Sequence, residues 1–147
     1  MKTSILAAIL LVCSGVMVCP IEGVVHQLRN AATNRCLDSD ARWLVYTQPC
    51  NGGDYQKWDL IPQEGSHTLY SYFFLKNVKT GVCAVYNFLD NGVHGSPDCS
   101  AIPRFTWTTS TNSNYLENVA ASGKCIDGDH LDMNGCSDAN TQQWIPE

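Results

Sequence analysis

The 147-residue sequence is short of charged side chains and contains no run of basic residues. Charged residues make up 16% of the chain, below the ~25% of an average soluble protein, and 14 Asp and Glu outnumber 9 Lys and Arg. Partners such as nucleic acid or an anionic lipid surface require clustered Lys and Arg. We therefore expect no nucleic-acid partner and no docking on an anionic membrane.

Sequence signatures of catalysis and of metal binding are also missing. The chain has no Gly-x-Ser-x-Gly and no His-Glu-x-x-His motif. Asp127-Gly128-Asp129 with Asp132 hints at calcium, but the twelve-residue loop that such a site requires is absent. Metal-ligand spacing is also missing at all four histidines, His26, His67, His94 and His130. We therefore expect that the protein is not an enzyme and that it binds neither a cofactor nor a metal.

After residue 23 no stretch shows the apolar period of an amphipathic helix. Residues 45–48 and 131–134 instead alternate apolar or small with polar side chains, which is typical of strands. Asn-Gly and Asp-Gly pairs at 51–52, 91–92, 127–128 and 134–135 favour turns. The pattern predicts an all-β domain.

The N-terminal segment has the features of a secretory signal peptide. Lys2 precedes an apolar run over residues 5–18, and small residues follow it. The run is shorter than the ~20 residues of a spanning helix, and no Lys/Arg cluster follows it, so we expect no membrane insertion. Eight cysteines in so short a chain also favour an oxidising compartment. The sequence therefore predicts a secreted, extracellular protein.

The cleavage position is set less clearly, because Gly15 and Gly23 are both small residues suited to precede a cut. A cut after Gly15 would leave Cys19 as an odd thiol, whereas a cut after Gly23 removes Cys13 and Cys19 together. We therefore expect a signal peptide over 1–23 and a single domain over 24–147.

The predicted domain repeats one pattern three times, in units of about 25–62, 70–110 and 113–147. Each unit begins with Leu-x-Asn, at 28–30, 75–77 and 116–118, and a Cys lies 8 or 9 residues after the Leu. A second Cys follows, 8 residues before a Trp, at Trp58, Trp107 and Trp144. A period of roughly 40 residues indicates a repeat architecture.

The repeat also predicts how the six remaining cysteines pair. Six cysteines allow fifteen connectivities, but equivalent positions in three copies should pair equivalently. Each bridge would close a short loop, worth ~3 kcal/mol in the chain-entropy model. We expect one disulfide in each unit, namely Cys36–Cys50, Cys83–Cys99 and Cys125–Cys136.

The ends of the units resemble a known family. Gln56-Lys57-Trp58 and Gln142-Gln143-Trp144 carry an intact Gln-x-Trp, which the second unit alters to Phe105-Thr106-Trp107. With the segments 34–38 and 45–53, this pattern is similar to the ricin-type β-trefoil lectin domain. The resemblance implies twelve strands around a pseudo-threefold axis: a six-stranded barrel capped by three hairpins, with the three tryptophans in its core.

The resemblance also implies where sugars bind. The family places a carboxylate two residues after the first Cys, and further contacts before the second Cys and at the Gln of Gln-x-Trp. In the first unit Trp43 or Tyr46 would supply the aromatic plate, because Gln48 occupies the usual stacking position. The implied first-unit site comprises Asp38, Tyr46, Gln48, Tyr55 and Gln56.

The other two units differ in these positions. The third unit offers polar groups throughout, with Thr141 beside its Gln and His130 expected on the same strand face; its implied sugar-binding residues are Asp127, Asp132, Asn134 and Gln142. The second unit has Val85 for the carboxylate, Phe105 for the Gln and Pro97 at the stacking position. We expect no sugar site in the second unit.

The resulting expectation is a secreted, non-catalytic lectin that binds a glycan or glycoprotein through Asp-centred sites in the first and third repeats. A galactose-like sugar is suggested by the resemblance alone. Because aromatic residues are missing at the stacking positions, an alternative remains open. In that alternative the protein is a secreted β-trefoil that binds a protein target, as an inhibitor or effector, and has lost sugar binding.

Overall fold

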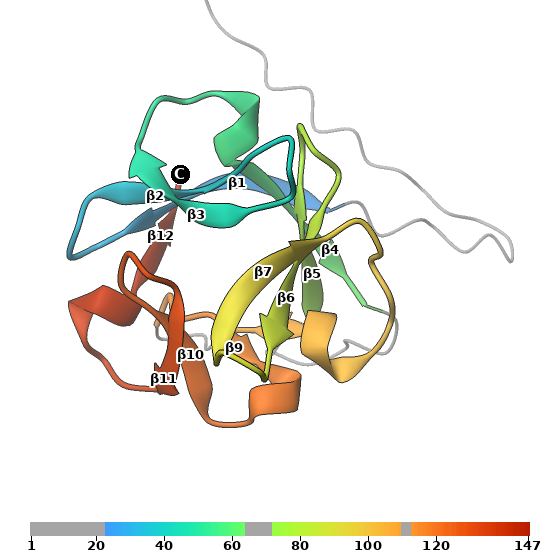
Figure 1. The fold of residues 1–147 in the computed structure, drawn as a ribbon. Coiled ribbons are helices and arrows are strands. Elements are labelled where there is room, and N and C mark those ends of the chain that lie inside the picture. The colour runs from blue at the N-terminus through green and yellow to red at the C-terminus, as the bar shows by residue number, and fades with distance from the viewer. Residues whose placement is uncertain (1–22, 64–71, 110–112) are drawn as a thin grey trace, which may run out of the picture.

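The computed structural model describes residues 23–63, 72–109 and 113–147 of the chain (Figure 1). Within these residues the protein is all-β and contains no α-helix. No helix there is long and apolar enough to cross a membrane. The expected signal peptide lies outside the described residues except for Gly23.

Twelve strands follow one another in three groups of four. The first group is β1 (Val24–Asn30), β2 (Arg35–Ser39), β3 (Val45–Pro49) and β4 (Lys57–Pro62); the second is β5 (Phe73–Asn77), β6 (Cys83–Asn87), β7 (Gly92–Ser96) and β8 (Trp107–Thr108); the third is β9 (Glu117–Asn118), β10 (Lys124–Asp127), β11 (Asp132–Gly135) and β12 (Trp144–Pro146). Four short 3-10 turns interrupt them: η1 (Asp54–Gln56), η2 (Pro103–Phe105), η3 (Val119–Ala121) and η4 (Asn140–Gln142).

The first and last strands of each group form a barrel, and the middle two form a hairpin. Antiparallel pairing joins β1 to β4, β4 to β5, β5 to β8, β8 to β9, and β12 back to β1. In the third unit, the segment just before β9 is linked to β12 by a hydrogen bond that the Trp144 N–H donates to the Asn114 carbonyl at 2.9 Å. The hairpins are β2–β3, β6–β7 and β10–β11 (Figure 1). This is the expected β-trefoil, in which closure leaves few exposed strand edges.

The three tryptophans occupy equivalent places in the core. Trp58, Trp107 and Trp144 are at most 1% exposed. Each indole Nε1–H donates to the carbonyl of the residue after the unit's first Cys, at 3.0, 3.0 and 3.1 Å, and the three acceptors are Leu37, Ala84 and Ile126. The buried rings therefore supply apolar area while their one polar group is satisfied.

The asparagine of each Leu-x-Asn motif ties its unit to the preceding one. Asn30, Asn77 and Asn118 are at most 1% exposed. Their side-chain amides donate to the carbonyls of Thr141, Tyr55 and Arg104 respectively, each the residue just before the Gln or Phe of the closing tripeptide. Because the contacts run from the third unit to the first, the first to the second and the second to the third, they close a ring.

The hairpin tips are held by neighbouring units in the same cyclic way. In the first tip, the Trp43 carbonyl lies against Gly95 on β7. A Cβ at position 95 would lie 2.1 Å from the carbonyl oxygen, so only glycine fits there. In the second tip, the Asn91 side chain donates to the Met133 carbonyl at 2.7 Å. In the third tip, Asp129 accepts from the Thr47 hydroxyl at 3.2 Å.

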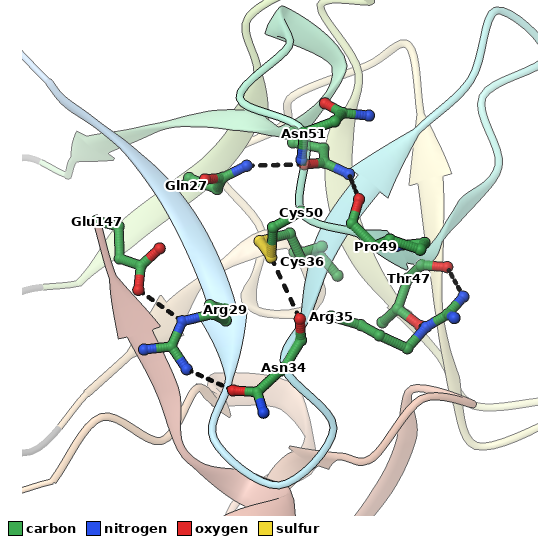
Figure 2. The surroundings of a disulfide bond; sticks show 12 residues. Gln27, Arg29, Asn34, Arg35, Cys36, Thr47, Pro49, Cys50, Asn51 and Glu147 are labelled. Atoms are coloured by element: carbon green, nitrogen blue, oxygen red, sulfur yellow. Dashed lines mark hydrogen bonds and ion pairs between the residues drawn. A yellow bond between two sulfur atoms is a disulfide. The ribbon is translucent and has the colours of Figure 1, made fainter.

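The three disulfides join Cys36 to Cys50, Cys83 to Cys99 and Cys125 to Cys136, which are the pairings that the repeat predicts. Each links the start of a hairpin to the loop that follows it. In the first unit, Figure 2 shows Asn34, Pro49 and Asn51 gathered around the Cys36–Cys50 bridge. The bridges thus fix the loops that lead into the closing tripeptides.

Three local expectations for the third hairpin were wrong. Leu131 was expected in a strand, but it lies in the turn with a φ of 58° and points its side chain into the core, so β11 starts at Asp132. His130 therefore lies in the turn and not on the strand face of Asp132. The Asn134-Gly135 pair was expected in a turn but ends β11, because both residues pair with β10.

Candidate functional site

The first-unit carboxylate is held in place by the Gln of the closing tripeptide. Asp38 lies in the buried part of β2 and is 4% exposed, and Gln56 in η1 is fully buried. The Gln56 Nε2 donates to Asp38 Oδ2 at 3.0 Å and to the Pro49 carbonyl at 3.0 Å. A carboxylate accepts about four hydrogen bonds, so Asp38 keeps capacity for a ligand.

The same Gln56 also accepts at its oxygen, from the Asn51 backbone N–H at 2.8 Å and from the Gln27 side chain at 2.7 Å. Gln27, Pro49 and Asn51, which are labelled in Figure 2, are thus all hydrogen-bond partners of the Gln56 amide. All of its hydrogen-bonding groups are thus engaged with protein, and no part of it reaches solvent. The residue positions Asp38 and is not itself open to a ligand.

A cavity of about 610 Å³ lies above Asp38. Four of the five residues expected in the first-unit site border it, Gln56 being the exception. The cavity is lined by Asp38, Ser39, Asp40, Ala41, Tyr46, Gln48, Asn51, Gly53 and Tyr55. Its size suits a small polar ligand such as one or two sugar rings.

Two tyrosines provide the aromatic surface. Tyr46 on β3 lies directly across from Asp38 on β2, and Tyr55 in η1 is 40% exposed. Burial, then the negative charges of Asp38 and Asp40 and a hydrogen bond to Asp38, raise the pKa of Tyr46 above its ordinary value. Trp43, the other residue expected as a plate, does not border this cavity.

Asp40 is a second carboxylate of the cavity, but it is engaged in the hairpin turn. Its Oδ1 accepts from the backbone N–H groups of Arg42 and Leu44, and its Oδ2 is paired with the Arg42 guanidinium at 3.1 Å. Burial opposes ionisation, yet these hydrogen bonds and the Arg42 charge lower the pKa of Asp40. Asp38 is therefore the carboxylate better placed to accept hydroxyl groups.

The third unit repeats the arrangement with a more exposed carboxylate. Gln142 Nε2 donates to Asp127 Oδ2 at 3.0 Å and to the Gly135 carbonyl at 2.9 Å. Burial alone would raise the pKa of Asp127, but hydrogen bonds from Gln142, Thr141 and Asn134 outweigh it and lower the pKa. The residue opposite Asp127 is Asp132, and like charges facing one another across a hairpin are unfavourable.

The second unit fills the same place with apolar side chains. Val85 and Phe105 are 7% and 1% exposed and pack in one cluster with Cys83. Neither offers a group that binds hydroxyls. The structure therefore brings together carboxylate and amide in the first and third units, and an apolar pair in the second.

Several residues of the first-unit cavity were not expected from the sequence: Ser39, Asp40, Ala41, Asn51 and Gly53. The Asn51-Gly52 pair was expected to form a turn, and Gly53 was noted only as the end of the segment 45–53 that resembles the family. In the structure the Asn51 side-chain oxygen accepts from the Gly53 N–H at 2.8 Å, which bends this loop toward η1. The tight Asx-type turn was the available signal. Among the described residues, no three His, Cys, Asp or Glu side chains come together as a metal site.

No protein-family profile matches the sequence. Solved structures with the same fold do match. A GlcNAcα1-4Gal-releasing endo-β-galactosidase from Clostridium perfringens aligns with a TM-score of 0.68 at 17% identity over 84% of this chain. The Rhizoctonia solani agglutinin aligns with a TM-score of 0.64 at 18% identity, over 84% of this chain and 94% of its own.

A third structure, the β-trefoil protein BEL, aligns with a TM-score of 0.67 at 19% identity, over 87% of this chain and 94% of its own. The chain spans only 32% of the length of the endo-β-galactosidase. At these identities the matches establish the β-trefoil fold of this chain.

Proposed function

We propose that this protein is a secreted, non-catalytic carbohydrate-binding protein whose principal site is the first-unit cavity. The observation that carries the proposal is the Asp38 carboxylate, held by Gln56 beneath a cavity bordered by Tyr46 and Tyr55. A pocket with an acceptor, neutral polar groups and aromatic edges has the chemistry that a sugar ring requires.

Each part of the cavity matches one part of a sugar. The Asp38 carboxylate accepts hydrogen bonds from hydroxyl groups, which are stronger because the acceptor is charged. The Gln48 and Asn51 amides border the cavity and can donate or accept. Tyr55 offers its exposed ring to the C–H face of the sugar. One open site of this kind typically binds at millimolar Kd, about −4 kcal/mol.

The third unit is proposed as a weaker second site built on Asp127, Asp132 and Asn134, with Gln142 as its positioning residue. The contacts of Asp127 with Gln142 support this role. Two weak sites on one molecule gain avidity on a multivalent glycan. A galactose-like sugar remains the first ligand to try, and the agglutinin among the structural matches is in keeping with sugar binding.

A second candidate, binding of a protein target, is favoured by the apolar hairpin tips. Trp43 and Leu44 in the first tip are each 51% exposed, and Phe88 and Leu89 in the second are 68% and 82% exposed. Large apolar groups exposed together are a common feature of protein interaction surfaces. This candidate predicts a protein ligand that depends on these tips and is indifferent to Asp38.

A glycan array probed with wild type, Asp38→Asn and Val85→Ala tests the proposal. Asp38→Asn keeps the shape and removes the charge, so we expect a loss of ~1.5–3 kcal/mol, about ten- to a hundredfold in affinity. Val85→Ala, the matched change in the second unit, should leave binding unchanged. If no glycan binds, or if Asp38→Asn binds like wild type, the proposal is wrong.

A further inference from the structure

A second cavity, of about 570 Å³, lies beside the first-unit site and belongs mainly to the second unit. Its lining includes Asp59 on β4, Lys76 on β5, and Lys79 and Thr80 in the turn between β5 and β6. None of these residues was expected in a site from the repeat pattern. We refer to this space as the lysine cavity.

Residues that line the lysine cavity contact residues that line the first-unit cavity. The Lys79 ammonium lies 5.9 Å from the centroid of the Tyr55 ring, and Tyr55 borders the first-unit cavity. The hydroxyls of Ser39 and Thr80, one from each cavity, lie 3.3 Å apart. In Figure 1 the tip of the β2–β3 hairpin accordingly lies beside the turn between β5 and β6. The two cavities are therefore neighbours on the molecule.

The two cavities have opposite charge. The first-unit cavity is bordered by the carboxylates of Asp38 and Asp40, whereas the lysine cavity is bordered by Lys76 and Lys79. Neither lysine forms an ion pair with any residue that the structure describes. Asp59, opposite Lys76 across the β4–β5 pair, is the one carboxylate in the lining. The two lysines and Asp59 together give the lining a net charge of +1.

The neighbouring groups do not neutralise the Lys79 ammonium. Asp54, whose pKa is affected by the Lys79 charge, forms an ion pair with Lys57 at 2.8 Å. The Lys57 hydrogen bond and charge, and to a smaller degree Lys79, lower the pKa of Asp54. Lys79 is exposed and supported by the Tyr55 ring, an arrangement that orients an ammonium without neutralising it.

We propose that the lysine cavity is a subsite for an anionic group, a carboxylate or sulfate, on a sugar next to the one held at Asp38. This inference rests on the proposed sugar site. The charges then fix the direction of the ligand: the neutral, hydroxyl-rich ring lies over Asp38, which would repel an anion, and the anionic ring crosses Tyr55 toward Lys76 and Lys79. The preferred ligand is an acidic oligosaccharide.

The test compares matched neutral, sialylated and sulfated oligosaccharides on one array, followed by titration of the best matched pair. For wild type we expect the acidic member to bind more tightly by about two- to fivefold per lysine, since exposed ion pairs are individually weak. The preference should shrink as salt rises, because these charges are screened.

Lys76→Gln and Lys79→Gln should each reduce the preference, and the double variant should abolish it while neutral binding persists. Lys124→Gln is the matched control. It removes the same charge in the third unit, where Lys124 contacts Asn91, and should retain the preference.

The outcomes separate the two proposals. If no oligosaccharide binds, the proposed sugar site fails and this inference fails with it. If neutral sugars bind in a manner that depends on Asp38, but acidic ones gain nothing, only the lysine cavity is refuted. Retention of the acidic preference in the Lys76→Gln, Lys79→Gln double variant likewise refutes it.

Discussion

The first and second units share a backbone but differ in what fills the space beneath the hairpin. Both have the Trp indole bonded to a carbonyl on the hairpin, a local disulfide and a buried Asn at the unit junction. The first places Asp38 against Gln56 there, and the second places Val85 near Phe105. Because the Trp hydrogen bond, the disulfide and the buried Asn stabilise both units, the pair of side chains beneath the hairpin can be either polar or apolar.

The two members of each pair must change together. A Gln introduced beside Val85 would lack a carboxylate to accept from its buried amide, at a cost of about 1–3 kcal/mol for the unsatisfied N–H. An isolated Asp beside Phe105 would bury an uncompensated charge, which costs more. The comparison therefore predicts that a substitution in the Asp38–Gln56 pair lowers both sugar affinity and stability, whereas a substitution in the Val85–Phe105 pair lowers stability alone.

The largest expected effect is on the stability of the second unit. Phe105→Ala removes a ring that is 1% exposed and should cost about 3–5 kcal/mol of unfolding free energy, through lost burial and a residual cavity. Urea denaturation measures the cost. Affinity for a glycan that binds wild type should not change in the folded protein; a tenfold loss would place a sugar contact in the second unit and break the comparison.

Gln56→Ala comes next and should affect stability and binding. Asp38, Pro49 and the Asn51 N–H all lose a buried partner, and we expect a cost of about 2–3 kcal/mol. Affinity should fall at least tenfold, because Asp38 is no longer held. Gln142→Ala, the matched change in the third unit, should cost similar stability while the first-unit site keeps its affinity.

The smallest effect concerns pH. Because the folded-state pKa of Asp127 lies below its usual value of 3.8, its ionised form stabilises the protein above that pH, and this contribution is lost as pH falls through the folded value. Asp127→Asn should therefore flatten the curve of stability against pH below about pH 4, measured by thermal melts. Val85→Ala should leave the slope unchanged, since the second unit has no carboxylate there; an unaltered slope in Asp127→Asn would contradict the role of Gln142.

Much of the fold was readable from the sequence, because three copies constrain one another. The spacing of Cys and Trp predicted a threefold repeat and the cysteine pairs, and the alternating side chains predicted an all-β fold. The role of the Leu-x-Asn asparagines was missed. Although the motif was visible, the bond from Asn77 to Tyr55 crosses units, and a repeat pattern reveals equivalence within a unit but not contact between units.

The site was only partly predictable for the same reason. Asp38 and Tyr46 were expected from the family resemblance, and both border the first-unit cavity, whereas the burial of Gln56 depends on the packing of η1 against β2. The lysine cavity is assembled from β4, β5 and the following turn, so Lys79 reaches Tyr55 only through the joining of two units. Leu131 was misplaced because a turn with positive φ looks like the start of an alternating strand.

The most direct test of the central claim is a titration with the best array glycan, followed by backbone amide shifts in NMR spectra. The account predicts that the shifts concentrate at Asn51, Gly53 and Tyr55 in the first unit, with smaller changes around Asp127 and none around Val85 and Phe105 in the second. Shifts of equal size at the equivalent positions of all three units, or shifts centred on Val85, would contradict the claim that the Asp38–Gln56 pair makes the site.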